Sequence, residues 1–115
     1  MRATEFLPNR YSEVETTTVT HDGEEYSVNK LLRISDNLQI HSIPVSALTW
    51  NIDPTSMDPH RIYNADTNVP VLITPYEDQL TVIDGAHRIA KAMQTKLPTI
   101  RCKYISPGML SQCKK

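Results

Sequence analysis

Cysteines and long apolar runs are scarce in this sequence, and each shortage excludes a class of protein. Two cysteines, Cys102 and Cys113, are too few for a disulfide scaffold or a cysteine-rich zinc site. No apolar run approaches the roughly 20 residues that a membrane-spanning helix needs, and the opening residues lack the apolar core of a secretory signal. We therefore expect no membrane span and a reducing, cytoplasmic setting.

Acidic residues are absent from residues 85–115. The formal net charge is only −1, from 12 Lys and Arg against 13 Asp and Glu. All 13 acidic residues lie within residues 1–84 together with five basic residues, whereas residues 85–115 hold seven basic residues and no acid. This asymmetry indicates an electropositive region able to hold an anion, although a solvated basic C-terminal segment explains the count as well.

The length of 115 residues fits one domain, and eight prolines divide it into short elements. The Asp22-Gly23 step between two β-rich runs predicts a hairpin. Apolar periodicity and cap residues predict strands at 14–20, 26–34, 38–43, 70–74, 80–83 and 99–105, and helical segments at 45–50, 58–65, 86–95 and from 107 onward. Ala47, Leu48 and Trp50 are expected to supply core contacts, as is Cys102. The predicted fold class is α+β.

The segment 82–92 carries the strongest chemical signal. A predicted strand ends at Ile83, a glycine turn follows at Gly85, and a helix begins at once. Ala86, Ile89, Ala90 and Met93 form the apolar face of this helix, which leaves three basic residues on the other side: His87, Arg88 and Lys91. Cations in the first turns of a helix oppose its dipole, and a bound anion removes that conflict.

Each residue of this turn also has a purely structural interpretation. Asp84 is a candidate N-cap that accepts from the amide of His87, a candidate orienting group for Arg88, or a ligand for a nucleotide-bound metal ion. Gly85 satisfies strand-to-helix geometry, and His87 or Arg88 alone would be an ordinary surface residue. Taken together at one strand-to-helix turn, they favour an anion site.

Three sequence blocks, Ile43–Leu48, Pro70–Ile73 and Ile83–Arg88, resemble the ParB-like/sulfiredoxin-like superfamily, and the segment 97–102 fits its closing strand. The resemblance runs from Ile40 to Ile105, and its signature is the box Asp-Gly-x-His-Arg. We therefore expect a single domain over residues 1–115, with the resemblance as its core at 40–105 and an N-terminal hairpin at 11–35 added outside the resemblance. The expected architecture is a mixed sheet flanked by short helices.

Members of this superfamily bind ATP or CTP phosphates at the helix that follows the box. The resemblance implies Gly85, His87 and Arg88 as phosphate ligands. The site expected from the helix as a whole adds Ala86 and Lys91. Asp84 and His87 are the candidate catalytic residues, and a Mg²⁺ ion is expected only with the nucleotide. No histidine spacing typical of a protein metal site occurs.

Activities in the superfamily diverge, and departures from its patterns narrow the choice. Ala86 stands where sulfiredoxins need a cysteine, which excludes the reductase activity, and where the free-serine kinases carry a histidine. Partition-type ParB proteins continue into a helix-turn-helix domain and a dimerisation tail, for which we expect no room in this chain. The resemblance leaves NTPase, phosphotransfer and nuclease activity open.

The leading hypothesis is thus a stand-alone domain that binds nucleotide phosphates at residues 84–88. The alternative is a non-catalytic accessory protein of a phage or mobile element that docks on a host protein or nucleic acid, with the acidic hairpin Glu13–Tyr26 as its docking surface. A third hypothesis is direct DNA or RNA binding through the basic last third. Asp58 and His60 are weaker candidates for a substrate-facing loop, and Glu77-Asp78 is expected to be a solvated turn.

Overall fold

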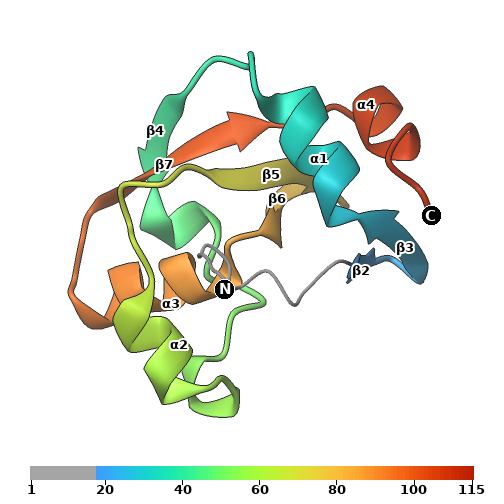
Figure 1. Ribbon diagram of the computed structural model, residues 1–115. Helices are drawn as coiled ribbons and strands as arrows, with labels where there is room; N and C mark the ends of the chain where they lie inside the picture. Colours follow the sequence, from blue (N-terminus) through green and yellow to red (C-terminus); the bar gives the residue numbers. More distant parts are fainter. Residues whose placement is uncertain (1–17) are drawn as a thin grey trace, which may run out of the picture.

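A four-stranded mixed sheet forms the centre of the computed structural model, which describes residues 18–115 (Figure 1). Its strand order is β4-β7-β5-β6. β7 pairs antiparallel with β4 and parallel with β5, and β6 pairs antiparallel with β5. The strands are β4 (His41–Pro44), β5 (Val71–Tyr76), β6 (Gln79–Asp84) and β7 (Thr99–Tyr104).

Within residues 18–115, a two-stranded sheet and six short helical segments surround this centre. The small sheet is the hairpin β2 (Thr18–His21) and β3 (Glu24–Ser27). The α-helices are α1 (Val28–Ser35), α2 (Pro59–Asn64), α3 (Ala86–Gln94) and α4 (Pro107–Ser111). Two 3₁₀ turns, η2 (Val45–Ala47) and η3 (Pro54–Ser56), precede α2. No helix within residues 18–115 is long and apolar enough to cross a membrane.

The sheet has a hydrophobic core on each face, because successive side chains of a strand point to opposite sides. In β5, Val71 and Ile73 pack with Ile89 of α3, whereas Leu72 packs with Leu31 of α1 and with α4. Figure 1 accordingly shows α2 and α3 on one side of the sheet and α1 and α4 on the other. The predicted α+β class, with a mixed sheet flanked by short helices, is confirmed.

The prediction of a second hairpin strand over 26–34 is wrong. β3 ends at Ser27, whose Oγ accepts from the amide of Lys30 at 3.2 Å and thereby caps α1. The buried side chains of α1 are Leu31 and Ser35, four residues apart, while Leu32 is 51% exposed. The apolar residues that suggested a strand therefore follow the spacing of a helix, which begins after the cap residue Ser27.

The hairpin turn itself is confirmed. Asp22 and Gly23 have φ of 52° and 80°, the left-handed pair that a two-residue turn requires. Residues 11–17 of the predicted hairpin extension lie outside the described residues. The C-terminal residues lie beside β3, since the Ser27 amide donates to the Cys113 carbonyl at 2.8 Å and the Lys115 amide donates to the Glu25 carbonyl at 3.0 Å.

The expected core contacts of the 45–50 segment hold only in part. Leu48 is completely buried, but Ala47 and Trp50 are exposed. The indole of Trp50 lies against the ring of Tyr76 at the surface instead of entering the core. Cys102 is buried as predicted.

Candidate functional site

The turn between β6 and α3 requires glycine. Gly85 has φ of +114° and is the residue from which α3 begins. A Cβ atom at this position would lie 2.6 Å from Cγ1 of Val71, a fully buried side chain of β5. The absence of that Cβ lets the helix start directly against the sheet, with the amides of its first turn at the strand end.

Asp84 and Arg88 are joined across this turn. Nη2 of Arg88 donates to Oδ2 of Asp84 at 3.2 Å. Nη1 of the same guanidinium donates to the carbonyls of Val69 and Pro70 at 3.2 Å and 2.7 Å. Of the roles considered for Asp84, the structure shows the one in which its carboxylate orients Arg88. The prediction that Asp84 is the N-cap of α3 is wrong. Asp84 is still paired with Leu72 in the sheet, Gly85 occupies the cap position, and no side chain of the described part of the chain caps α3.

Lys91 is directed toward α2. Its ammonium donates to the carbonyls of Tyr63 and Ala65 at 2.7 Å and 2.9 Å, and it lies 5.8 Å from the centroid of the Tyr63 ring. These carbonyls belong to the C-terminal end of α2, where a cation is favourable. Lys91 thus joins the two helices, and its role as a phosphate ligand stays a prediction.

His87 is half-buried in the first turn of α3. Burial lowers the pKa of its imidazole, and the positive charges of Arg61 and Arg88 lower that pKa further, while the carboxylate of Asp58 acts in the opposite direction. The imidazole is therefore neutral at pH 7 in the free protein. An anion beside it would favour the protonated form.

Arg61 is a residue that sequence reasoning missed. It belongs to α2 and acts electrostatically on His87 of α3, so the packing of these two helices brings the two side chains near each other. No local spacing links them, and the only sequence signal was a lone arginine in the predicted helix 58–65. Asp58 caps α2 by accepting from the amide of His60 at 2.9 Å.

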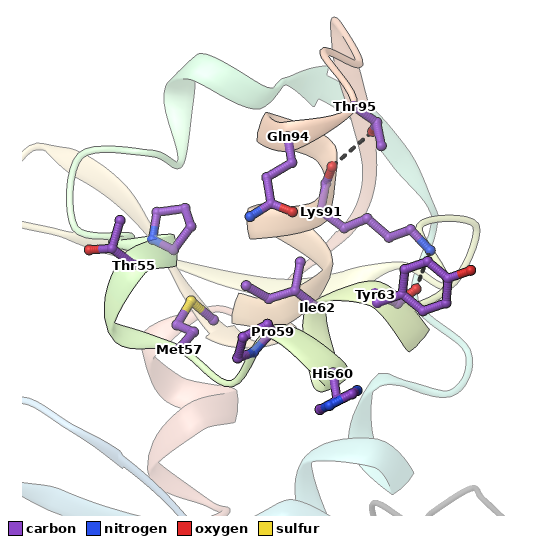
Figure 2. Close-up of a pocket in the computed structure, with 10 residues that line it drawn as sticks. Thr55, Met57, Pro59, His60, Ile62, Tyr63, Lys91, Gln94 and Thr95 are labelled. Carbon is purple, nitrogen blue, oxygen red and sulfur yellow. Dashed lines mark hydrogen bonds between the residues drawn. The ribbon is translucent and has the colours of Figure 1, made fainter.

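A cavity of about 740 Å³ lies between η3, α2 and the C-terminal half of α3 (Figure 2). Its apolar wall includes Met57 and Ile62, and Lys91 and Tyr63 stand side by side at its edge. His60 also lines this cavity, while Asp58 does not. The complete lining is Pro54, Thr55, Met57, Pro59, His60, Ile62, Tyr63, Lys91, Gln94 and Thr95.

The basic charges of residues 85–115 do not form one surface. Arg88 and Lys91 lie on the α2–α3 side, whereas the Lys103 ammonium donates to the Ser35 carbonyl at 3.0 Å, at the end of α1 on the other side of the sheet. The side chain of Lys115 donates to Thr18 in the hairpin. Direct DNA or RNA binding through the basic residues of 85–115 stays a prediction.

Comparison with known proteins gives similarity of fold alone. No protein-family model matches the sequence, and no curated protein matches it. A sulfiredoxin from Arabidopsis thaliana matches with a TM-score of 0.47 and 20% identity over 64% of this chain and 94% of that one. The truncated chromosome-partitioning protein ParB from Caulobacter crescentus, in complex with CTP-γ-S, matches with a TM-score of 0.47 and 17% identity, over 64% of this chain and 49% of that one. These are the two kinds of protein named by the sequence resemblance.

Proposed function

We propose that this chain binds the phosphates of a nucleotide, ATP or CTP, at the turn between β6 and α3. The observation that carries the proposal is the composition of the first turn of α3. That turn holds His87 and Arg88, contains no acidic residue, and receives no side-chain cap. An uncapped helix N-terminus flanked by basic side chains favours a bound anion, because backbone amides and side-chain donors would bind it together.

The proposed ligands are the first-turn amides of α3 and basic side chains of α2 and α3. The first-turn amides, Gly85 through Arg88, have no acceptor within α3 and would donate to the phosphates. Arg88 uses three of its N–H groups on Val69, Pro70 and Asp84, which fix the guanidinium while leaving two N–H groups for a phosphate. His87 donates from its imidazole, and Arg61 adds positive charge from α2. In this proposal Lys91 acts through its charge from the second turn.

In this proposal Mg²⁺ binds together with the nucleotide. Among residues 18–115 no cluster of three or more His, Cys, Asp or Glu side chains is placed to hold a metal ion. The carboxylate at the turn, Asp84, already accepts from Arg88. One carboxylate together with phosphate oxygens is a typical magnesium environment. Asp84 and His87 stay the proposed catalytic pair, with His87 as the proton donor or acceptor for an NTPase, phosphotransfer or nuclease step.

Calorimetric titration with ATP and CTP, with and without Mg²⁺, tests the proposal. We expect one nucleotide to bind, and we expect His87→Ala and Arg61→Ala each to weaken binding about tenfold, as charge-assisted contacts do. Arg101→Ala is the matched control. It removes one exposed positive charge from β7, where neighbouring Ile100 and Cys102 face α3 and Arg101 therefore faces away. Absence of binding by the unmodified chain, or an equal loss in the Arg101 variant, would show the proposal to be wrong.

A further inference from the structure

A row of aromatic side chains lies where the β2–β3 hairpin meets the turn between β5 and β6. The ring of Tyr76 is in the middle, with the indole of Trp50 parallel to it at 6.4 Å and the imidazole of His21 edge-on at 5.2 Å. Trp50 is 43% exposed, and Tyr76 and His21 are half-buried. Three elements distant in sequence therefore contribute to one aromatic surface.

The exposed indole of Trp50 is held in a fixed position. Its Nε1 donates to the Leu80 carbonyl at 2.7 Å, and the adjacent Asn51 donates to Oγ1 of Thr81 at 3.0 Å. Both partners belong to β6, so the segment around Trp50 is fastened to the edge of the sheet. An ordered tryptophan that keeps a large exposed area loses little side-chain entropy on binding, and such residues dominate the binding energy of protein interfaces.

Two carboxylates lie near the central ring, Tyr76. The Tyr76 hydroxyl donates to Oδ1 of Asp22 at 3.3 Å, and the negative charges of Asp22 and Glu77 raise the pKa of that hydroxyl. Asp78 follows Glu77 in the β5–β6 turn, and all three acidic side chains are exposed. Within residues 18–115 none of the three forms a salt bridge.

The β5–β6 turn has an unusual backbone conformation for the acidic residues that it contains. Glu77 and Asp78 both have positive φ, 48° and 66°, in a two-residue turn where Asn-Gly is the favoured pair. The sequence thus places two carboxylates where Asn and Gly are favoured, in the turn that directly follows Tyr76.

We propose that Trp50, Tyr76 and His21, together with Asp22, Glu77 and Asp78, form a docking surface for a protein segment that carries Lys or Arg side chains. Below, these six residues are named the aromatic–acidic surface. A guanidinium or ammonium group is attracted by the face of an indole and by a nearby carboxylate, and its apolar stem packs on the ring. The negative charge makes nucleic acid an unfavourable partner for the same surface.

This docking surface is separate from the proposed phosphate site. The aromatic–acidic surface lies at the start of β6, beside Gln79 and Leu80, whereas the phosphate site begins at Asp84, where β6 ends. A six-residue strand separates the two by roughly 17 Å. The two proposals can therefore be tested with separate variants.

The fluorescence of Trp50 provides a direct test, because the chain contains one tryptophan. The probe is a capped hexa-arginine peptide, and the control probe is the same peptide with citrulline, which has the shape of arginine but no charge. We expect hexa-arginine to change the Trp50 emission saturably and with an affinity that falls as salt rises. The citrulline peptide is expected to leave the emission unchanged.

Two variants locate the binding. Glu77→Gln combined with Asp78→Asn is expected to weaken hexa-arginine binding about three- to tenfold, since each exposed charge pair contributes modestly. Asp36→Asn, at the end of α1, removes an exposed charge outside the surface and is expected to leave the affinity unchanged. Thermal denaturation of each variant verifies that it is folded.

Three results would overturn the proposal: no saturable change with hexa-arginine, equal binding of the citrulline peptide, or equal weakening in the Asp36 variant. A fourth result comes from sedimentation of the free protein at several concentrations, with the Trp50 emission recorded at each. If the emission changes as a dimer forms, a second copy of the chain occupies the surface and the proposal is wrong.

Discussion

Arg88 and Asp84 form an ion pair across one turn, with Nη2 and Oδ2 3.2 Å apart, and the same guanidinium holds the Val69 and Pro70 carbonyls. This one side chain therefore connects the end of β6 with the segment that leads into β5. The side chain of Arg88 is 16% exposed, so the pair is neither a freely hydrated surface contact nor a fully buried one. Arg88 has a structural role in addition to the one proposed in phosphate binding.

Arg88→Ala is expected to lower both stability and nucleotide affinity. The loss of donors for the Val69 and Pro70 carbonyls costs about 1–3 kcal/mol, measured by urea denaturation. Asp84→Asn removes only the charge of a partly exposed pair and is expected to cost about 1 kcal/mol or less. Equal losses of stability in the two variants would contradict the assignment of carbonyl contacts as the main structural role of Arg88.

His87→Glu separates binding from folding because the two effects have opposite signs. A carboxylate in the first turn of α3 interacts favourably with the helix dipole and with Arg61 and Arg88, and it is expected to raise stability by about 0.3–1 kcal/mol. The same carboxylate occupies the anion position and is expected to abolish nucleotide binding.

The matched control is Asn29→Glu, which places the same charge at the equivalent helical position of α1, on the other side of the sheet. It is expected to raise the melting temperature without changing the affinity for nucleotide. A His87→Glu variant that binds ATP or CTP as well as the unmodified chain would exclude the α3 N-terminus as the phosphate site.

The lowered pKa of His87 predicts how stability depends on pH. Below the ordinary histidine value near 6.5, the unfolded chain takes up a proton that the folded chain resists, so this residue destabilises the fold as pH falls toward its folded pKa. His87→Gln should reduce the difference in unfolding free energy between pH 7.5 and pH 5.5. An undiminished difference would show that the pKa of His87 is not lowered by folding.

Nucleotide binding should raise the lowered pKa of His87, because a phosphate beside His87 stabilises the imidazolium. We expect proton uptake on binding near pH 6.5, measured as a dependence of the calorimetric enthalpy on the ionisation enthalpy of the buffer. His87→Gln should remove the part of the uptake that belongs to the imidazole. The remainder in that variant reports the nucleotide itself, whose terminal phosphate titrates near pH 6.

Gly85→Ala is expected to destabilise the protein by about 2–4 kcal/mol, since φ of +114° is unfavourable for alanine and the new Cβ would overlap with Val71. Gly108→Ala, in α4, is the control: a Cβ there meets nothing within 4 Å, and the substitution is expected to stabilise by about 0.4–1 kcal/mol. Chemical denaturation of both variants provides the comparison. A tolerated Gly85→Ala substitution would contradict the tight turn geometry.

Local signals predicted most of the elements. Asp58-Pro59 and Ser106-Pro107 marked the starts of α2 and α4, and both cap side chains accept a backbone amide as expected. The wrong prediction of a strand where α1 lies also depends on a cap residue. Ser27 ends a strand and caps a helix at once, and a strand period and a helix period overlap in the residues that follow.

The site was less predictable than the fold. The segment 84–88 lies within one turn of chain, and its geometry followed from the order strand, glycine, helix. The hydrogen-bond partners of its basic side chains could not be predicted, because they are set by tertiary packing. Arg88 donates to the carbonyls of Val69 and Pro70, and Lys91 donates to those of Tyr63 and Ala65. A sequence shows that a lysine is available for a contact, but the packing decides which acceptor is near.

The C-terminal residues that lie beside β3 have a consequence for the order of folding. Lys30 and Lys114, which are joined by a hydrogen bond at 3.4 Å, are 84 residues apart in sequence, so closing this contact early would cost much chain entropy. The central sheet and α3 can assemble without it. We therefore expect the hairpin to dock last during folding and to open first in the native protein, with its amides exchanging with solvent before those of β5 and β7.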